Sequence, residues 1–148
     1  RRQRQMCIRD RDLIIIENYK FLPLICYEII YSGNLNRNFK DYNFIVNISE
    51  DGWFGNSIGP HQHFAHSIFR AIEEGKNVFR SSNNGVSAHI NPVGKIEDKI
   101  ESTQSGVIEV QKVKFSERTH FSKHGNKIFF YFLVIYITFA SFLKRKDL

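Results

Sequence analysis

The chain has 148 residues, of which 42% are hydrophobic and 14% aromatic, a length and composition that predict one folded domain and exclude a disordered chain. Its net charge is +6, but residues 1–11 contribute +4 of it, so the remaining chain carries only +2. No basic stripe remains that would indicate nucleic-acid binding, and we expect no nucleic-acid partner.

Residues 1–11, RRQRQMCIRDR, differ in kind from the rest of the chain. They show neither an apolar period nor a secretory signal pattern, so we interpret them as an extraneous or disordered basic segment. The domain is then expected to begin at Asp12. Cys26 is the one cysteine beyond this segment, and a single cysteine gives no disulfide framework.

Apolar runs predict the first strands. Residues 13–16 and 21–26 are short continuous runs typical of strands buried on both faces, and residues 43–49 form a β-branched run of the same kind. Between them, residues 31–42 combine turn residues with a short predicted helix. The three glycines of EDGWFGNSIGP, residues 50–60, indicate a loop.

The next predicted element is a helix that begins at Pro60 and ends at Gly75. Proline is favoured in the first helical turn because its missing N–H would have no intrahelical partner there, and glycine commonly ends a helix. Apolar residues recur at three- and four-residue spacing along this segment. Those expected to face the core are Phe64, Ile68, Ala71 and Ile72.

Strands and turns complete the predicted domain. Residues 77–82 indicate a strand, the NNG of 83–85 a turn, residues 86–100 a hairpin turning at 91–94, and residues 106–110 a last strand. The alternation of strands and helices, followed by a hairpin, predicts a layered α/β domain with a mixed sheet.

The C-terminal tail is apolar on every side. Residues 128–143 contain no charge, and basic residues flank them at both ends. Sixteen helical residues rise about 24 Å, less than a hydrocarbon core of about 30 Å, but snorkelling lysines and bilayer thinning cover the difference. We expect a transmembrane helix with its basic end over 127–145, a connector over 114–126 and a cytoplasmic C-terminus. The alternative is a buried core helix.

Cys26 is the candidate nucleophile. It ends an apolar run and precedes YEII, which can start a helix. A sulfur at a strand-to-helix turn lies near helix N–H groups, which favour the thiolate, and a sharp turn of this kind presents one reactive atom beside backbone donors for an oxyanion. The alternative is that Cys26 is a small hydrophobic residue of the core.

Three stretches carry a family resemblance. PLICYEII, NISEDGWFGNSIGPHQHF and RAIEEGKNVFRSSNNGVSAHINPVGKI occur in that order before the apolar helix that ends in Lys and Arg. Over residues 21–145 the chain resembles the apolipoprotein N-acyltransferases of the nitrilase, or carbon-nitrogen hydrolase, superfamily. The resemblance implies a nitrilase-like α-β-β-α sandwich, present in part, with residues 12–113 as the C-terminal part of that domain. Soluble nitrilases lack the terminal span.

The resemblance also implies a chemistry, without a cofactor. Cys26 would take the acyl group of a membrane phospholipid as a thioester and pass it to the α-amine of the diacylglyceryl-cysteine of an apolipoprotein. Tyr27 and Glu28 match motif positions beside the nucleophile and are expected to support it. Three residues in loops are expected near the site, with core packing as the alternative for the two aromatic ones: Trp53, Phe54 and Asn83.

Two features depart from the family pattern. The family's general-base Glu and oxyanion-stabilising Lys lie upstream of the cysteine, and neither Glu17 nor Lys20 sits in the matching pattern, so neither role is assigned to them. We therefore expect a C-terminal piece of a longer, multi-pass bacterial inner-membrane enzyme with a periplasmic catalytic domain. In addition, Glu50-Asp51 stands where the family usually has Asn-Asp.

Two alternative functions stay open, and a metal site is not predicted. The chain could belong to a soluble or membrane-tethered carbon-nitrogen hydrolase of the amidase or nitrilase type, or be a catalytically incomplete fragment. His61 and His63 point about 200° apart on a helix, so they cannot join His66 around one metal ion. We expect His63 to form structural hydrogen bonds, and for Arg80 and Asn83 the interpretation we favour over a site role is burial with hydrogen bonds to loop backbone.

Overall fold

A computed structural model describes residues 12–33, 35, 41–111 and 113–146. The helix predicted within residues 31–42 falls largely on residues outside this description. The elements are β1 (Ile14–Ile16), β2 (Tyr19–Ile25), the 3-10 helix η1 (Cys26–Ile30), β3 (Phe44–Glu50), the 3-10 turn η2 (Gly52–Phe54), α2 (Gly59–Glu74), β4 (Asn77–Asn83), β5 (Ser87–Ile90), β6 (Ile96–Ile100), α3 (His120–His124) and α4 (Lys127–Lys146).

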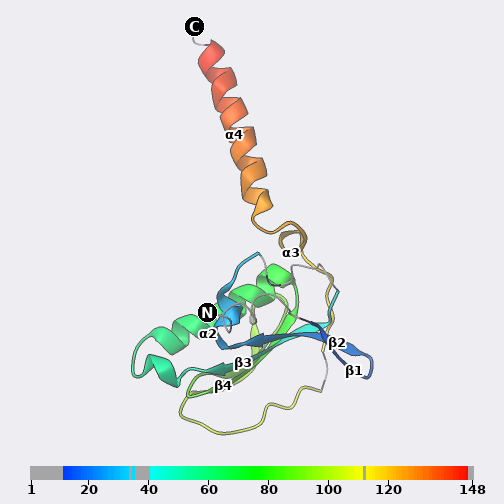
Figure 1. Cartoon of the computed structure of the whole chain (residues 1–148), viewed down its shortest axis with the longest axis vertical. Coiled ribbons are helices and arrows are strands. Elements are labelled where there is room, and N and C mark those ends of the chain that lie inside the picture. The colour runs from blue at the N-terminus through cyan, green and yellow to red at the C-terminus, as the bar shows by residue number, and fades with distance from the viewer. Residues whose placement is uncertain (1–11, 34, 36–40, 112, 147–148) are drawn as a thin grey trace, which may run out of the picture.

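One mixed sheet organises the described residues. Its strand order is β1-β2-β3-β4-β5-β6, in which β2, β3 and β4 run parallel while β1, β5 and β6 pair antiparallel. Helix α2 covers one face of this sheet (Figure 1). The mixed α/β fold predicted from the sequence is confirmed. Because parallel strands place their carboxyl ends at one edge, the segments that come after β2, β3 and β4 meet there.

The two faces of the sheet bury different side chains. On the face toward α2, alternate positions of neighbouring strands are fully buried, among them Leu22, Leu24, Ile45 and Val78. On the opposite face aromatic rings cross the strands: the ring centroids of Phe21 and Phe44 lie 5.5 Å apart, and those of Phe44 and Phe79 lie 5.1 Å apart. The core therefore lies between the sheet and α2.

Two strand predictions need correction. The described residues 106–110 pair with no strand; they run along the face opposite α2, where Ile108 and Val110 line a cavity of about 260 Å³, while Val107 is 92% exposed. The run at 13–16 does form β1, but its isoleucines are exposed rather than buried on both faces. The reason is that β1 lies at one edge of the sheet and pairs only with β2.

Helix α2 begins and ends where the sequence predicts. Pro60 lies in its first turn, and Gly75 ends it in the left-handed conformation at φ 64°. Its buried face, however, is largely polar, and comprises His63, Ser67, Arg70, Ala71 and Glu74. Of the expected core residues only Ala71 is fully buried; Phe64 and Ile68 pack in part and Ile72 is 45% exposed. The reason is that β3 and β4 present polar side chains to the helix, so polar groups face each other.

The hairpins form as predicted. Strands β4 and β5 join through Asn84, at φ 57°, and Gly85, and β5 joins β6 through the turn that ends at Gly94, at φ 83°. Only glycine adopts such angles at little cost, and asparagine tolerates them better than most residues.

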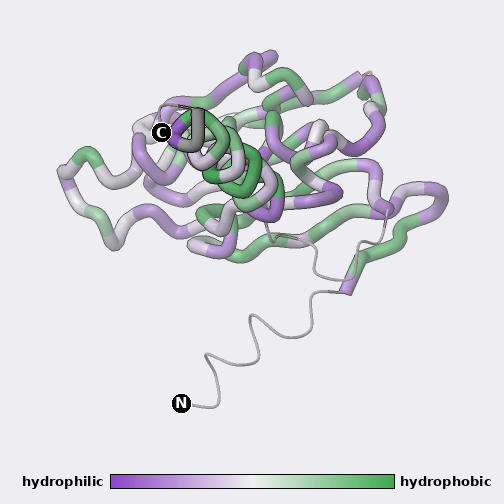
Figure 2. Tube along the Cα trace, turned by 90° about the horizontal axis from the view of Figure 1, so that it is seen from above, coloured by the Kyte–Doolittle hydropathy of each residue, from purple (hydrophilic) through white to green (hydrophobic). Residues whose placement is uncertain are grey.

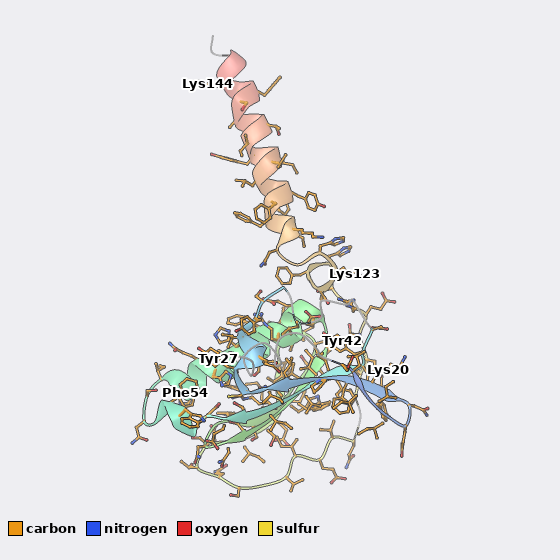
Figure 3. The ribbon with its side chains drawn as sticks, in the orientation of Figure 1. Lys20, Tyr27, Tyr42, Phe54, Lys123 and Lys144 are labelled. Atoms are coloured by element: carbon orange, nitrogen blue, oxygen red, sulfur yellow. The ribbon has the colours of Figure 1, made fainter. Side chains whose placement is uncertain are left out.

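The connector packs onto the domain and leads to an isolated helix. Ser122 and Tyr42 donate hydrogen bonds to the Glu74 carboxylate at 2.5 Å and 2.7 Å, and Thr119 hydrogen-bonds the Glu73 carbonyl. Beyond α3, helix α4 projects away from the domain with its side chains pointing outward (Figure 3), and hydrophobic residues dominate its length (Figure 2).

Helix α4 has the length and composition of a membrane span. None of its 127–144 window is buried against the rest of the described chain, which contradicts the alternative of a core helix. Twenty helical residues rise about 30 Å, enough for a hydrocarbon core. This is consistent with the single C-terminal transmembrane helix predicted from the sequence.

Candidate active site

Cys26 occupies a strained turn at the carboxyl edge of the sheet. It is the first residue of η1, directly after the internal strand β2, and its φ is 49°, a left-handed angle that is uncommon outside glycine and asparagine. The Glu28 carboxylate accepts the backbone N–H of Ile25 at 2.8 Å and so fastens this turn. The sharp strand-to-helix turn is present, but η1 has only five residues, so its helix dipole is small.

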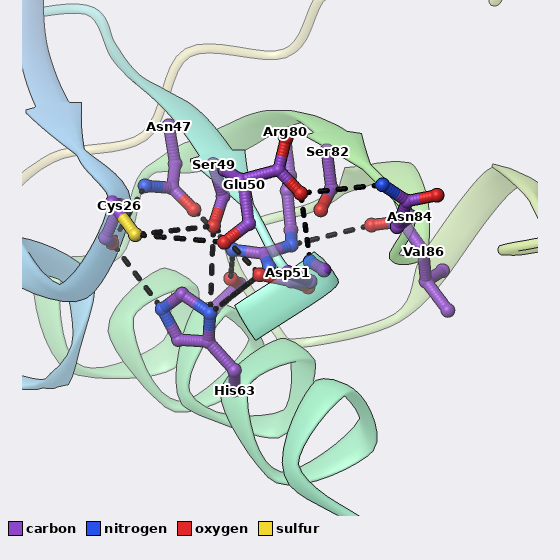
Figure 4. Close-up of polar contacts among 12 residues, drawn as sticks. Cys26, Asn47, Ser49, Glu50, Asp51, His63, Arg80, Ser82, Asn84 and Val86 are labelled. Carbon is purple, nitrogen blue, oxygen red and sulfur yellow. Dashed lines mark hydrogen bonds and ion pairs between the residues drawn. The ribbon is translucent and has the colours of Figure 1, made fainter. Parts of the chain in front are cut away.

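The sulfur of Cys26 faces the end of β3. Its Sγ lies 3.9 Å from the Glu50 carbonyl oxygen and 3.8 Å from Ser49 Oγ, and the residue is half-buried (Figure 4). Because β2 and β3 pair in parallel up to Ile25 and Ile48, this position is set by the strand register. The sulfur therefore stands at a fixed place where two strands end.

A buried charged network lies beneath this turn. Asp51 Oδ1 lies 2.8 Å from His63 Nδ1, and Asp51 Oδ2 accepts a hydrogen bond from Arg80 Nη2 at 2.7 Å. The Asp51 and Arg80 side chains have no exposed surface. Burial raises the pKa of Asp51, but hydrogen bonds from His63 and Ser49 and the Arg80 charge outweigh it and hold that pKa well below its usual range. Asp51 is therefore a carboxylate at neutral pH.

Polar residues of β3 join the network to the cysteine turn. Asn47 Nδ2 donates to the carbonyl oxygens of Leu24 at 3.1 Å and Cys26 at 3.4 Å, and its own oxygen accepts from Arg80. Ser49 Oγ donates to Asp51 Oδ1 at 2.7 Å. The backbone carbonyls of Leu24 and Cys26 are thus fastened to a buried side chain.

Glu50 links the loops after β3 and β4. Its carboxylate accepts hydrogen bonds from Asn83 Nδ2 at 2.5 Å, the Gly52 N–H at 2.7 Å and Asn84 Nδ2 at 3.3 Å, and these bonds lower its pKa. Next to this link the chain approaches closely, since a Cβ on Gly85 would overlap Asp51 Oδ2. Glu50 therefore makes a definite loop contact with Asn83, which is exposed and bonds a side chain, whereas the sequence led us to expect burial and hydrogen bonds to loop backbone.

The two aromatic residues expected near the site, Phe54 and Trp53, differ in their surroundings. The ring centroids of Tyr27 and Phe54 lie 5.4 Å and 5.7 Å from that of His63 and 6.4 Å from each other. Trp53 is 86% exposed. Phe54 thus packs over the network, whereas Trp53 presents its ring outward from the η2 loop.

Two polar cavities adjoin these loops. One of about 550 Å³ is lined by Asp51, the glycine loop after it, His61 and the 102–103 segment. The second, of about 620 Å³, is lined almost entirely by serine, threonine and amide side chains of residues 81–87 and 102–106. Both include Asn84, so the loops at the carboxyl edge of the sheet leave room for polar groups of a ligand beside Asn84.

The sequence pointed to only part of this arrangement. The hydrogen bond from Arg80 Nε to the Val86 carbonyl at 3.2 Å and the hydrogen-bonding role of His63 are as expected. The roles of Asn47, Ser49 and Asp51 were missed. Their signal is a polar residue at every second position of an otherwise apolar strand, which marks a buried polar face. Within the described residues, no three His, Cys, Asp or Glu side chains lie close enough together to hold a metal ion.

Comparison with known proteins identifies the family. The carbon-nitrogen hydrolase family profile matches residues 7–113. The chain belongs to the carbon-nitrogen hydrolase family. Two similar members are apolipoprotein N-acyltransferases: that of Wigglesworthia glossinidia brevipalpis is 37% identical over 132 residues, and that of Rickettsia bellii 38% identical over 136, each alignment covering 88% of this chain. The alignments cover 26% and 27% of these relatives, so the chain spans about a quarter of their length.

A solved member is less similar. It is a carbon-nitrogen hydrolase superfamily protein from Xanthomonas campestris with an arsenic adduct in its active site. It is 16% identical, with a TM-score of 0.49, and the match covers 82% of this chain and 48% of that protein.

Proposed function

We propose that this chain is the C-terminal part of a bacterial apolipoprotein N-acyltransferase, with residues 12–113 in the carbon-nitrogen hydrolase domain, 114–126 as connector and 127–145 in the membrane. The placement of Cys26 carries the proposal: a thiol raised on a strained turn where parallel strands end is suited to nucleophilic attack. The names of the relatives indicate the acyltransferase activity, and the apolar helix α4 fits an enzyme whose substrates are lipids.

The proposed reaction has two steps that share the sulfur. The Cys26 thiolate attacks the ester carbonyl of a phospholipid, the C–O bond breaks, and the lysophospholipid hydroxyl leaves with a proton. The α-amine of the diacylglyceryl-cysteine of an apolipoprotein then attacks the thioester carbonyl, the C–S bond breaks, and the thiol is regenerated. Each step is an acyl transfer of moderate difficulty in place of one direct aminolysis.

We assign supporting positions to the neighbours of the sulfur. Glu28 fastens the cysteine turn through the Ile25 N–H, and Tyr27 covers His63. Glu28 is therefore engaged in shaping the turn rather than in proton transfer. The base and the oxyanion donor come from the upstream part of the enzyme, whose catalytic domain faces the periplasm while the basic end of α4 lies in the cytoplasm.

A chimera tests the function. This chain replaces the matching quarter of the Rickettsia bellii enzyme, and acyl transfer from phospholipid to a diacylglyceryl-cysteinyl peptide is followed by mass spectrometry, with the unmodified Rickettsia enzyme as control. We expect product from the chimera and none from its Cys26→Ala variant. The 148-residue chain alone is expected to form no product, since loss of a single oxyanion donor already slows such reactions by about a hundredfold or more. A chimera that hydrolyses small amides but transfers no acyl group would favour the amidase-type hydrolase.

A further inference from the structure

The carbonyl group of Cys26 is held by side chains that lie far apart in the sequence. His63 Nε2 lies 3.2 Å from the Cys26 carbonyl oxygen, and Asn47 Nδ2 lies 3.4 Å from it. His63 comes from the first turns of α2 and Asn47 from the middle of β3, so both sides of the core contact the cysteine turn. Figure 4 shows the imidazole ring between Cys26 and Asp51.

Both ring nitrogens of His63 face hydrogen-bond acceptors. Nε2 faces the Cys26 carbonyl, and Nδ1 faces the Asp51 carboxylate at 2.8 Å. Arg80 Nη2 lies farther from Nδ1, at 3.3 Å, and donates to Asp51 Oδ2 at 2.7 Å. Neither a carbonyl nor an ionised carboxylate can donate, so both contacts are hydrogen bonds only when both nitrogens carry a proton. The His63 side chain is 1% exposed, and water cannot replace either partner there.

We propose that His63 is a positioning residue for the Cys26 nucleophile: as an imidazolium it bridges Asp51 and the Cys26 carbonyl and holds Cys26 in its left-handed conformation. The inference rests on the proposed function only in taking Cys26 as the nucleophile. A left-handed φ on a residue with a Cβ is strained, and it persists only where surrounding contacts outweigh the strain. The hydrogen bonds from His63 and Asn47 are contacts of this kind.

The charges around the ring balance in the reactive state. The charged and titratable groups that face His63 are Asp51 after β3, Arg80 on β4, Cys26 and Tyr27 on η1, and His66 on its own helix. Each oxygen of Asp51 accepts from one cation, Oδ1 from His63 and Oδ2 from Arg80. With an imidazolium and a thiolate on the half-buried Cys26, the groups around the ring carry two positive and two negative charges, so each charge has an opposite one nearby.

Alkylation of Cys26 reports on this arrangement without any acyl transfer. The full 148-residue chain in detergent micelles, in a Cys7→Ser background so that Cys26 is the only thiol, is treated with iodoacetamide, and the adduct is followed by intact mass. We expect His63→Phe, which removes both ring donors, to slow alkylation about tenfold, the effect of losing roughly one charged hydrogen bond. His63→Gln, which returns one neutral donor to the carbonyl, should recover part of the rate. The matched control is His66→Gln on the same helix, which should react as the parent does.

If His63→Phe does not fold, nitrogen NMR of the parent chain tests the proposal instead, because it observes the two ring nitrogens of His63 directly. We expect ¹⁵N-labelled His63 to show both ring nitrogens protonated at neutral pH, with two slowly exchanging ring N–H protons. This NMR result does not depend on the acyl-transfer assay, so the positioning role of His63 and the proposed acyltransferase function can be refuted independently. A His63 ring with one unprotonated nitrogen, or a folded His63→Phe chain that alkylates at the parental rate, would overturn the inference.

Discussion

Replacing Arg80 by methionine removes the cation of the buried network while keeping a side chain of similar length. Arg80 and Asp51 have no exposed side-chain surface, and after Arg80→Met the Asp51 carboxylate keeps only His63 and Ser49 as partners. The Val86 carbonyl and the Asn47 amide oxygen also lose a buried donor. Breaking one side of a buried ion pair costs about 3–5 kcal/mol, because the remaining charge cannot reach water.

Thermal unfolding of the chain in detergent, followed by circular dichroism, measures this cost. For a chain of this size the loss corresponds to a fall in Tm of about 6–20 °C. The Tm of Arg80→Lys should lie between those of the parent and Arg80→Met, because lysine keeps the charge but not the planar fork that reaches Asp51, Asn47, Ser67 and Val86. The control Lys95→Met breaks an exposed pair with Glu97, 3.0 Å apart, which is worth less than about 1 kcal/mol. If the Tm of Arg80→Met equals that of Lys95→Met, the stabilising role of the network is refuted.

Three other parts of the chain give further predictions. Because the folded pKa of Asp51 lies below its ordinary value of 3.8, its contribution to stability is present above that value and is lost as the pH falls toward the folded pKa. The free energy of unfolding should therefore fall as the pH drops below about 4, and Asp51→Asn should flatten this dependence; equal slopes would contradict it. Gly85→Ala should lower Tm, since the added Cβ would collide with Asp51 Oδ2. Gly106→Ala should be tolerated, because its added Cβ would lie 3.2 Å from the nearest atom, on the flexible end of the Ile100 side chain. The parent chain should stay in membranes during alkaline carbonate washing, and Ile135→Arg should be released, because an arginine at mid-bilayer costs about 3 kcal/mol; release of the parent would argue against a membrane span.

Local sequence patterns predicted the helix ends and hairpin turns, because single residues with strong backbone preferences determine them. Pro60 and Gly75 mark the ends of α2 through their own backbone preferences. The Asn84-Gly85 pair marks the first hairpin turn, and Gly94 ends the second. The run at 106–110 has the composition of a strand, but composition does not decide whether it pairs. Among the described strands β6 is an edge strand that pairs only with β5, yet residues 106–110 run along the face opposite α2 instead of adding to that edge.

The polar core could not be derived in this way. Asp51, His63 and Arg80 come from three elements, and each by itself resembles a surface residue. Their pairing depends on the register of β3 with β4 and on the position of α2. The position of Cys26 at the end of a strand was predictable from the apolar run before it, whereas the left-handed turn and the two side chains that hold its carbonyl required the structure.

A covalent acyl adduct is the most direct test of the proposed function. The chimeric enzyme is incubated with phospholipid in the absence of the peptide acceptor, and its intact mass is measured and mapped to a peptide. We predict one acyl group on Cys26, lost on addition of the diacylglyceryl-cysteinyl peptide and absent from Cys26→Ala. Acyl transfer that persists in the Cys26→Ala chimera would contradict the assignment of Cys26 as nucleophile.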